Sequence, residues 1–179
     1  MDVTTLIEEA IGREGGYVNH PADTGGATRW GVTEAVARAH GYRGNMRFYP
    51  REEAVAVYRR IYWLRPGFDR VAALAPRLAA EMFDTGINMG PDVAAGFLQR
   101  ALNALNRGGS DYPDLLVDRR IGDLTIAALA AFLALRGAPG ETVLLKALEA
   151  LQGERYVSLA EQRPANEAFL YGWLANRIG

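Results

Sequence analysis

The sequence predicts a mainly α-helical protein with one small β-hairpin. Apolar residues recur at helical spacing through most of the 179 residues, and prolines and glycines separate these stretches. Residues 14–33 interrupt the pattern, because this segment contains five glycines among polar side chains. Two short stretches with strand potential, residues 17–18 and 30–32, are enough for one hairpin.

The first helix is expected to end at Glu14. An apolar stripe recurs at helical spacing and leads directly to this glutamate; it contains Val3, Leu6, Ile7, Ala10 and Ile11. Gly15 and Gly16 then stop the helix. A carboxyl group at this place is partly removed from water and lies near the negative end of the helix dipole, and both effects raise its pKa. Glu14 is therefore a candidate general acid.

Asp23 is the second candidate catalytic residue. It lies in the turn PADTGG, residues 21–26, which cannot be helical and which leaves the carboxyl group in water and ionised. Two carboxyl groups in contrasting environments are what cleavage of a glycosidic bond requires. The hydroxyl of Thr28 is suited to positioning a water molecule. The pattern also allows a simpler interpretation, in which Glu14 is a solvated helix end and Asp23 serves its own turn.

Two short helices are expected after the glycine-rich segment. Thr33 has a side chain suited to an N-cap, and Gly41 ends this helix. Pro50 is expected to begin the next helix, which ends before Pro66. Its aromatic run YRRIYW, residues 58–63, is suited either to stacking on sugar rings or to the core, and the helical spacing favours the core.

A helix over residues 77–88 carries a further polar pair. Asp84 and Asn88 are four residues apart and share a helix face. If this face lines a cleft, Asn88 would bind a sugar amide and Asp84 would orient a partner. Alternatively, the two residues form a surface pair near a helix end at Gly90.

Helices are expected to fill the rest of the chain. Pro91 begins a strongly periodic helix, residues 107–118 have loop composition, and another helix begins after Asp123 or Thr125. The last two helices are expected at residues 140–162 and 165–178, which Pro164 separates.

Composition excludes several classes of function. The formal net charge is -1, so no basic surface indicates a nucleic acid partner. Cysteine is absent and only two histidines occur without a fitting carboxylate cluster, so we expect no metal and no other cofactor. The first residues include acids and no long apolar run, which predicts synthesis in the cytoplasm without a signal peptide and no stable membrane insertion. We expect a monomer.

The segment EGGYVNHPADTGGATRWGVT, residues 14–33, resembles the signature of muramidases of glycoside hydrolase family 108, a lysozyme-like family. The strings FDTGINMGP and FLYGWLANR, later in the chain, are also similar to this family. The resemblance implies a lysozyme-like helical fold with its hairpin near the active site. It further implies hydrolysis of the β-1,4 bond between N-acetylmuramic acid and N-acetylglucosamine in peptidoglycan, with Glu14 as the acid and Asp23 and Thr28 beside it. The expected substrate-binding residues are Tyr17, Asn19, Trp30, Asp84 and Asn88.

The strings LQRALN and VDRRIGDLTIAAL, residues 98–103 and 117–129, resemble three-helix peptidoglycan-binding modules, which have a glycine where Arg119 stands here. This resemblance implies two domains, a catalytic lobe in residues 1–91 and a helical peptidoglycan-binding-like lobe in residues 92–179, packed on the first. The alternative is a helical lobe that only supports the catalytic one.

Two other functions compete with the muramidase. In a lytic transglycosylase, Glu14 would act alone, and in a peptidoglycan-binding or secretion-accessory protein the site would be inactive. The resemblance implies that peptidoglycan glycan strands are the partner and that the protein acts on the cell wall, in the periplasm or outside the cell. Delivery would require a holin, as for a phage endolysin, or a bacterial export machinery.

Overall fold

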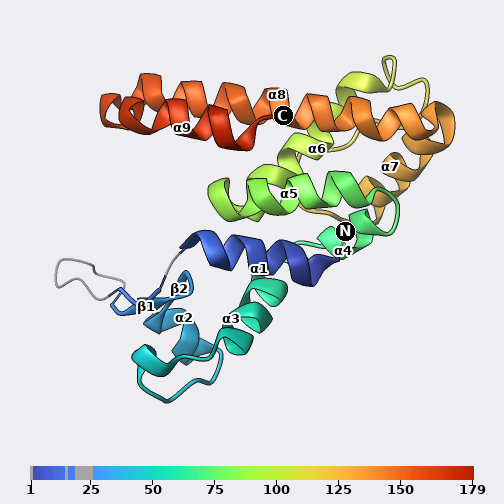
Figure 1. The fold of residues 1–179 in the computed structure, drawn as a ribbon. Coiled ribbons are helices and arrows are strands. Elements are labelled where there is room, and N and C mark those ends of the chain that lie inside the picture. The colour runs from blue at the N-terminus through green and yellow to red at the C-terminus, as the bar shows by residue number, and fades with distance from the viewer. Residues whose placement is uncertain (1, 15, 19–25) are drawn as a thin grey trace. The chain divides into compact units, whose positions relative to one another are not determined.

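The computed structural model describes residues 2–14, 16–18 and 26–179, and it confirms a mainly α-helical fold with one small hairpin (Figure 1). The chain divides into two compact units, Met1–Arg65 and Pro66–Gly179. Each unit is described by itself. Within the described ranges, no helix combines the length and the apolar character needed to cross a membrane.

The first unit is built around the packing of its first helix. Its elements are α1 (Val3–Glu14), β1 (Thr28–Arg29), β2 (Val32–Thr33), α2 (Glu34–Ala39), the 3-10 helix η1 (Met46–Phe48), α3 (Arg51–Tyr58) and the π-helix η2 (Arg59–Leu64). α1 packs on α3 and buries Ile7, Ala10 and Ile11, which belong to the predicted stripe. The last residue of α1 is Glu14, as the stripe and the glycines after it predict.

The hairpin differs from the predicted one at Trp30. β1 and β2 pair antiparallel, with Thr28 opposite Thr33 and Arg29 opposite Val32. Trp30 and Gly31 form the turn between them, at φ of 55° and 74°. A two-residue hairpin turn takes positive φ at both positions because this matches the twist of the strands. The predicted strand over residues 30–32 is therefore wrong at Trp30, where the turn overrides the strand propensity of an aromatic residue.

The second unit is a helical bundle around one long helix, α8 (Figure 1). Its elements are α4 (Phe68–Ala72), α5 (Pro76–Met89), α6 (Pro91–Leu105), α7 (Asp123–Arg136), α8 (Ala138–Gln162), the 3-10 helix η3 (Pro164–Asn166) and α9 (Glu167–Arg177). α8 contacts α5, α6, α7 and α9. The fully buried side chains between these helices include Leu78, Met82, Leu98, Leu102, Leu144 and Leu148.

α9 packs on this bundle without a fully buried residue. The indole ring of Trp173, in α9, stacks on the ring of Tyr156, in α8, with the two ring centroids 5.2 Å apart. The helical spacing of Phe169, Leu170, Trp173 and Leu174 predicts an apolar face, but the Phe169 side chain is 59% exposed. The difference arises because α9 lies mainly along α8 and η3, so the bundle covers only part of the predicted face.

Gln99, in α6, anchors the turn that precedes α7. Its side chain is 2% exposed; Oε1 accepts a hydrogen bond from the Arg119 N–H at 2.8 Å, and Nε2 donates to Asp118 Oδ1 at 2.7 Å. Arg119 has φ of 63°, in the left-handed region that glycine adopts most readily. This conformation favours glycine, the residue that the resemblance leads us to expect at this position.

Replacing Arg119 with glycine is expected to raise the free energy of unfolding. A non-glycine residue loses about 1–2 kcal/mol in the left-handed region, and the greater freedom of glycine in the unfolded chain cancels part of the gain. The exposed ion pair with Asp92, at 3.8 Å, contributes little. We expect a net gain of about 0.5–1 kcal/mol, measured by urea unfolding followed by circular dichroism.

Arg120→Gly is the matched control, because Arg120 is the next residue and does not have positive φ. This variant is expected to lose stability. A loss of similar size in Arg119→Gly would contradict backbone strain at Arg119.

Candidate active site

The predicted catalytic residues lie at the end of α1 and at the start of β1. Glu14 is the last residue of α1, and Thr28 is the first residue of β1. The side chain of Glu14 and the whole of Asn19 and Asp23 lie outside the described residues. The roles predicted for these three residues therefore stay predictions.

Two main-chain hydrogen bonds to Val18 hold Thr28 on one side of its strand. Its N–H donates to the Val18 carbonyl oxygen and its own carbonyl accepts from the Val18 N–H, each at 2.8 Å. On the other side it pairs with Thr33. The Thr28 side chain is half-buried, and its hydroxyl makes no hydrogen bond to a described residue. Its backbone is thus fixed while its hydroxyl can bind a ligand.

The indole of Trp30 is held beside this strand pair by residues of its own unit. Its Nε1–H donates to the Tyr49 carbonyl oxygen at 3.1 Å. The guanidinium groups of Arg29 and Arg51 lie 5.2 Å and 5.8 Å from the ring centre. Positive φ is uncommon for a bulky residue, and such strain persists only when surrounding contacts maintain it. Trp30 can therefore offer a sugar its ring, while its N–H is already bonded.

Tyr17, the remaining described residue of the predicted sugar contacts in this unit, faces a cation. The Arg47 guanidinium lies 5.1 Å from the centre of its ring. Tyr17 is half-buried and next to Val18, which pairs with Thr28. The main chain thus places Tyr17 next to the residue that pairs with the strand carrying a predicted catalytic hydroxyl.

The second unit contains the other predicted pair, Asp84 and Asn88, on α5. Asn88 Nδ2 donates to Asp84 Oδ2 at 3.1 Å and to the Asp84 carbonyl oxygen at 2.8 Å. Arg177 of α9 donates from Nη1 to both oxygens of the Asp84 carboxylate, at 3.0 Å and 3.2 Å. Asp84 thus orients two side chains, one from its own helix and one from the end of the chain.

A buried polar cluster lies next to this pair. Gln152 is fully buried; in the amide orientation that satisfies both of its groups, Nε2 donates to Glu81 Oε1 at 3.2 Å and to the Arg177 carbonyl oxygen at 3.1 Å. Its Oε1 accepts from the Thr85 hydroxyl at 3.1 Å. Burial, together with the nearby charges of Asp84 and Glu149, raises the pKa of Glu81 to about 7.

Arg177 and Gln152 of this cluster are not among the site residues that the sequence predicts. Arg177 follows Trp173 by four residues, so the two share one face of α9. This spacing is the feature of the sequence that could have placed Arg177 on the packed face of the helix. No feature of the sequence indicates a role for Gln152, because that role depends on the packing of α8 against α5.

The pKa of Glu81 predicts how the stability of the protein changes with pH. The folded state holds the Glu81 proton more tightly than the unfolded chain, whose value is near 4.5. The free energy of unfolding therefore falls as the pH rises from about 4.5 to about 7 and levels off above that. Glu81→Gln should remove this fall, which is worth about 1–3 kcal/mol, in urea unfolding series between pH 4 and pH 8.

Glu154→Gln, at an exposed position of α8, is the control for the loss of one carboxyl group. It should keep the wild-type pH dependence. If Glu81→Gln kept the same dependence as well, Glu81 would not be the titrating group.

Comparison with known proteins assigns both parts of the chain. Residues 7–90 match the family Glycosyl hydrolase 108, and residues 93–178 match the family Predicted Peptidoglycan domain. The chain is similar to the solved structure of SagA from Brucella abortus, with 25% identity, a TM-score of 0.54 and coverage of 93% of this chain and 94% of that one. No curated protein matches significantly. The chain thus contains a glycosyl hydrolase 108 domain followed by a predicted peptidoglycan domain, and it is a glycoside hydrolase that acts on peptidoglycan.

Proposed function

We propose that the protein is an N-acetylmuramidase that hydrolyses the β-1,4 bond between N-acetylmuramic acid and N-acetylglucosamine, with Glu14 as the general acid. The observation that carries this proposal is the position of Glu14. It is the last residue of a helix whose buried stripe leads to it, and it lies within the residues that match Glycosyl hydrolase 108. The C-terminal end of a helix carries the negative end of the helix dipole, which favours the protonated form of a carboxyl group.

In this mechanism Glu14 donates its proton to the glycosidic oxygen as the bond from that oxygen to the anomeric carbon breaks. Positive charge then develops on the sugar ring. The ionised carboxylate of Asp23 stabilises this charge and accepts a proton from the attacking water. The hydroxyl of Thr28, on a backbone held by Val18, orients that water.

We further propose that sugar contacts occur in both compact units of the chain. Tyr17, Asn19 and Trp30 would contact the sugars near the catalytic residues, with Trp30 using its ring. Asn88, which Asp84 orients, would bind an acetamido group. We also propose that residues 1–91, which include Asn88, carry catalysis and that residues 92–179 hold the polymer; the change of matched family between residues 90 and 93 supports this division.

Glu14→Gln is expected to lower the hydrolysis of isolated peptidoglycan about 10²- to 10⁴-fold, because the amide cannot supply the proton. The rate is measured as the release of soluble fragments from dye-labelled sacculi. Glu9→Gln is the matched control, since Glu9 is an exposed glutamate of the same helix, and it should keep wild-type activity.

Circular dichroism and the melting temperature should be the same for all three proteins. Wild-type activity in Glu14→Gln would refute the assignment of the acid. Asp23→Asn extends the test to the water: strong loss is expected, and full activity would instead favour a transglycosylase, which needs no water activation.

A further inference from the structure

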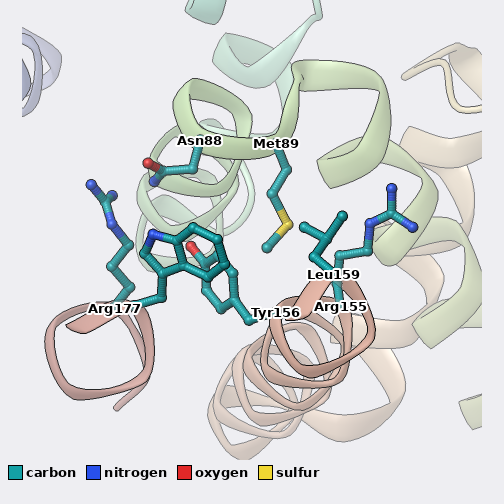
Figure 2. Close-up of a pocket in the computed structure, with 7 residues that line it drawn as sticks. Asn88, Met89, Arg155, Tyr156, Leu159 and Arg177 are labelled. Carbon is teal, nitrogen blue, oxygen red and sulfur yellow. The ribbon is translucent and has the colours of Figure 1, made fainter. Parts of the chain in front are cut away.

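The second unit has a pocket of about 350 Å³ between α5, α8 and α9, and its two arginines lie apart. Figure 2 shows Arg155 and Arg177 at opposite ends of this pocket, with Met89 between them. Arg177 is also already in an ion pair. The pocket therefore offers no neighbouring pair of cations to a ligand, whereas the first unit does so beside its hairpin.

Two arginines of the first unit are stacked on aromatic rings next to the hairpin. The guanidinium carbon of Arg29, in β1, lies over the ring of Trp30 at 5.2 Å from its centre. That of Arg47, in η1, lies over the ring of Tyr17 at 5.1 Å from its centre. β1 packs against η1, so the two arginines come from neighbouring elements. We call Arg29 and Arg47 the hairpin cations.

The main chain places the hairpin cations beside a residue of the proposed catalytic site. Val18 and Thr28 exchange two hydrogen bonds in an antiparallel bridge. In such a bridge the residue before one partner and the residue after the other lie at the same end. Tyr17, which carries Arg47 over its ring, and Arg29 are these two residues. Both cations thus lie near Thr28, whose hydroxyl we propose orients the attacking water.

No carboxylate of the described residues neutralises the hairpin cations. Neither guanidinium forms an ion pair with a described aspartate or glutamate. Carboxylates on adjoining elements have other partners, because Glu34 is paired with Arg38 and Glu8 is paired with Arg51. One hairpin cation is exposed and the other is half-buried, so both can be reached from the solvent.

Stacking on a ring leaves the hydrogen-bond donors of a guanidinium available. Its five N–H groups lie in the plane of the group, whereas the aromatic ring contacts its face. The ring also restricts the side chain, so less conformational freedom is lost when the donors bind an anion. A planar fork of donors matches the geometry of a carboxylate. The hairpin therefore presents two oriented sites for carboxylates.

We propose that the hairpin cations bind carboxylates of the peptide stem of peptidoglycan. This inference rests on the proposed muramidase function, because the stem is attached to N-acetylmuramic acid, the sugar whose bond we propose is cleaved. A stem has more than one free carboxylate, so no single group has to contact both arginines. N-acetylglucosamine carries no stem and no charge. Recognition of the stem thus distinguishes the two sugars of the polymer and selects strands that carry peptides.

The test compares sacculi whose carboxylates are free with sacculi whose carboxylates have been converted to neutral amides by a carbodiimide and ammonium chloride. The initial rate at which the full chain releases dye-labelled fragments is measured against sacculus concentration. We expect wild type to need roughly tenfold more amidated sacculi for half-saturation, because two charge pairs are lost. The maximum rate should stay within about twofold, because such pairs strengthen binding before and during the reaction alike.

The double variant Arg29→Gln/Arg47→Gln should need roughly tenfold more of the free sacculi and show no further change on the amidated ones, because the same interaction is already absent. Arg60→Gln/Arg65→Gln is the matched control. It removes two exposed arginines of the same unit and should keep both wild-type values. Circular dichroism checks the fold. If the double variant does not fold, each single variant should show about a threefold change on free sacculi.

Equal half-saturation of wild type on free and amidated sacculi would overturn the proposal, even if the double variant were impaired, because the cations would then bind another anion. A double variant that matches wild type on free sacculi, or that stays fully sensitive to amidation, would overturn it as well. So would a change confined to the maximum rate. The comparison needs only the release of fragments, so its failure is separate from a failure of Glu14→Gln to lose hydrolysis.

Discussion

The ion pair between Arg177 and Asp84 attaches α9, the last helix of the second unit, to α5 of the same unit. α9 buries none of its residues completely, so burial of apolar surface gives it only part of its attachment. Arg177 is fixed twice, since its guanidinium contacts Asp84 and its carbonyl oxygen accepts from Gln152. Both side chains of the pair are less than one third exposed, so it is screened less than a surface pair. The wall of the pocket formed by α9 depends on these contacts.

Next to this pair lies Glu81, a half-buried glutamate whose pKa is raised. The charge of Asp84 raises the pKa of Glu81, and the Asp84 carboxylate is itself paired with Arg177. When Glu81 is protonated it does not compete with Asp84 for the charge of Arg177. Asp84 accepts hydrogen bonds from both Arg177 and Asn88. The polar cluster thus connects the stability of the bundle to the geometry of a residue that we propose binds sugar amides.

Much of this architecture follows from local pattern. The stripe that leads to Glu14, the N-cap at Thr33 and the start of a helix at Pro91 all follow from rules that act over a few residues. Trp30 lies in the hairpin turn and not in the predicted strand, because the turn type depends on how two strands pair. The pocket was not predicted, because its residues lie far apart in the sequence and meet only when α5, α8 and α9 pack.

The central claim is that this glycoside hydrolase cleaves the bond after N-acetylmuramic acid by adding water. Mass spectrometry of the soluble products, after purified protein is incubated with isolated sacculi, tests this claim most directly. The account predicts muropeptides with reducing N-acetylmuramic acid ends. Anhydro ends would show that the sugar's own hydroxyl attacks, and reducing N-acetylglucosamine ends would show cleavage of the other glycosidic bond; either result would contradict it.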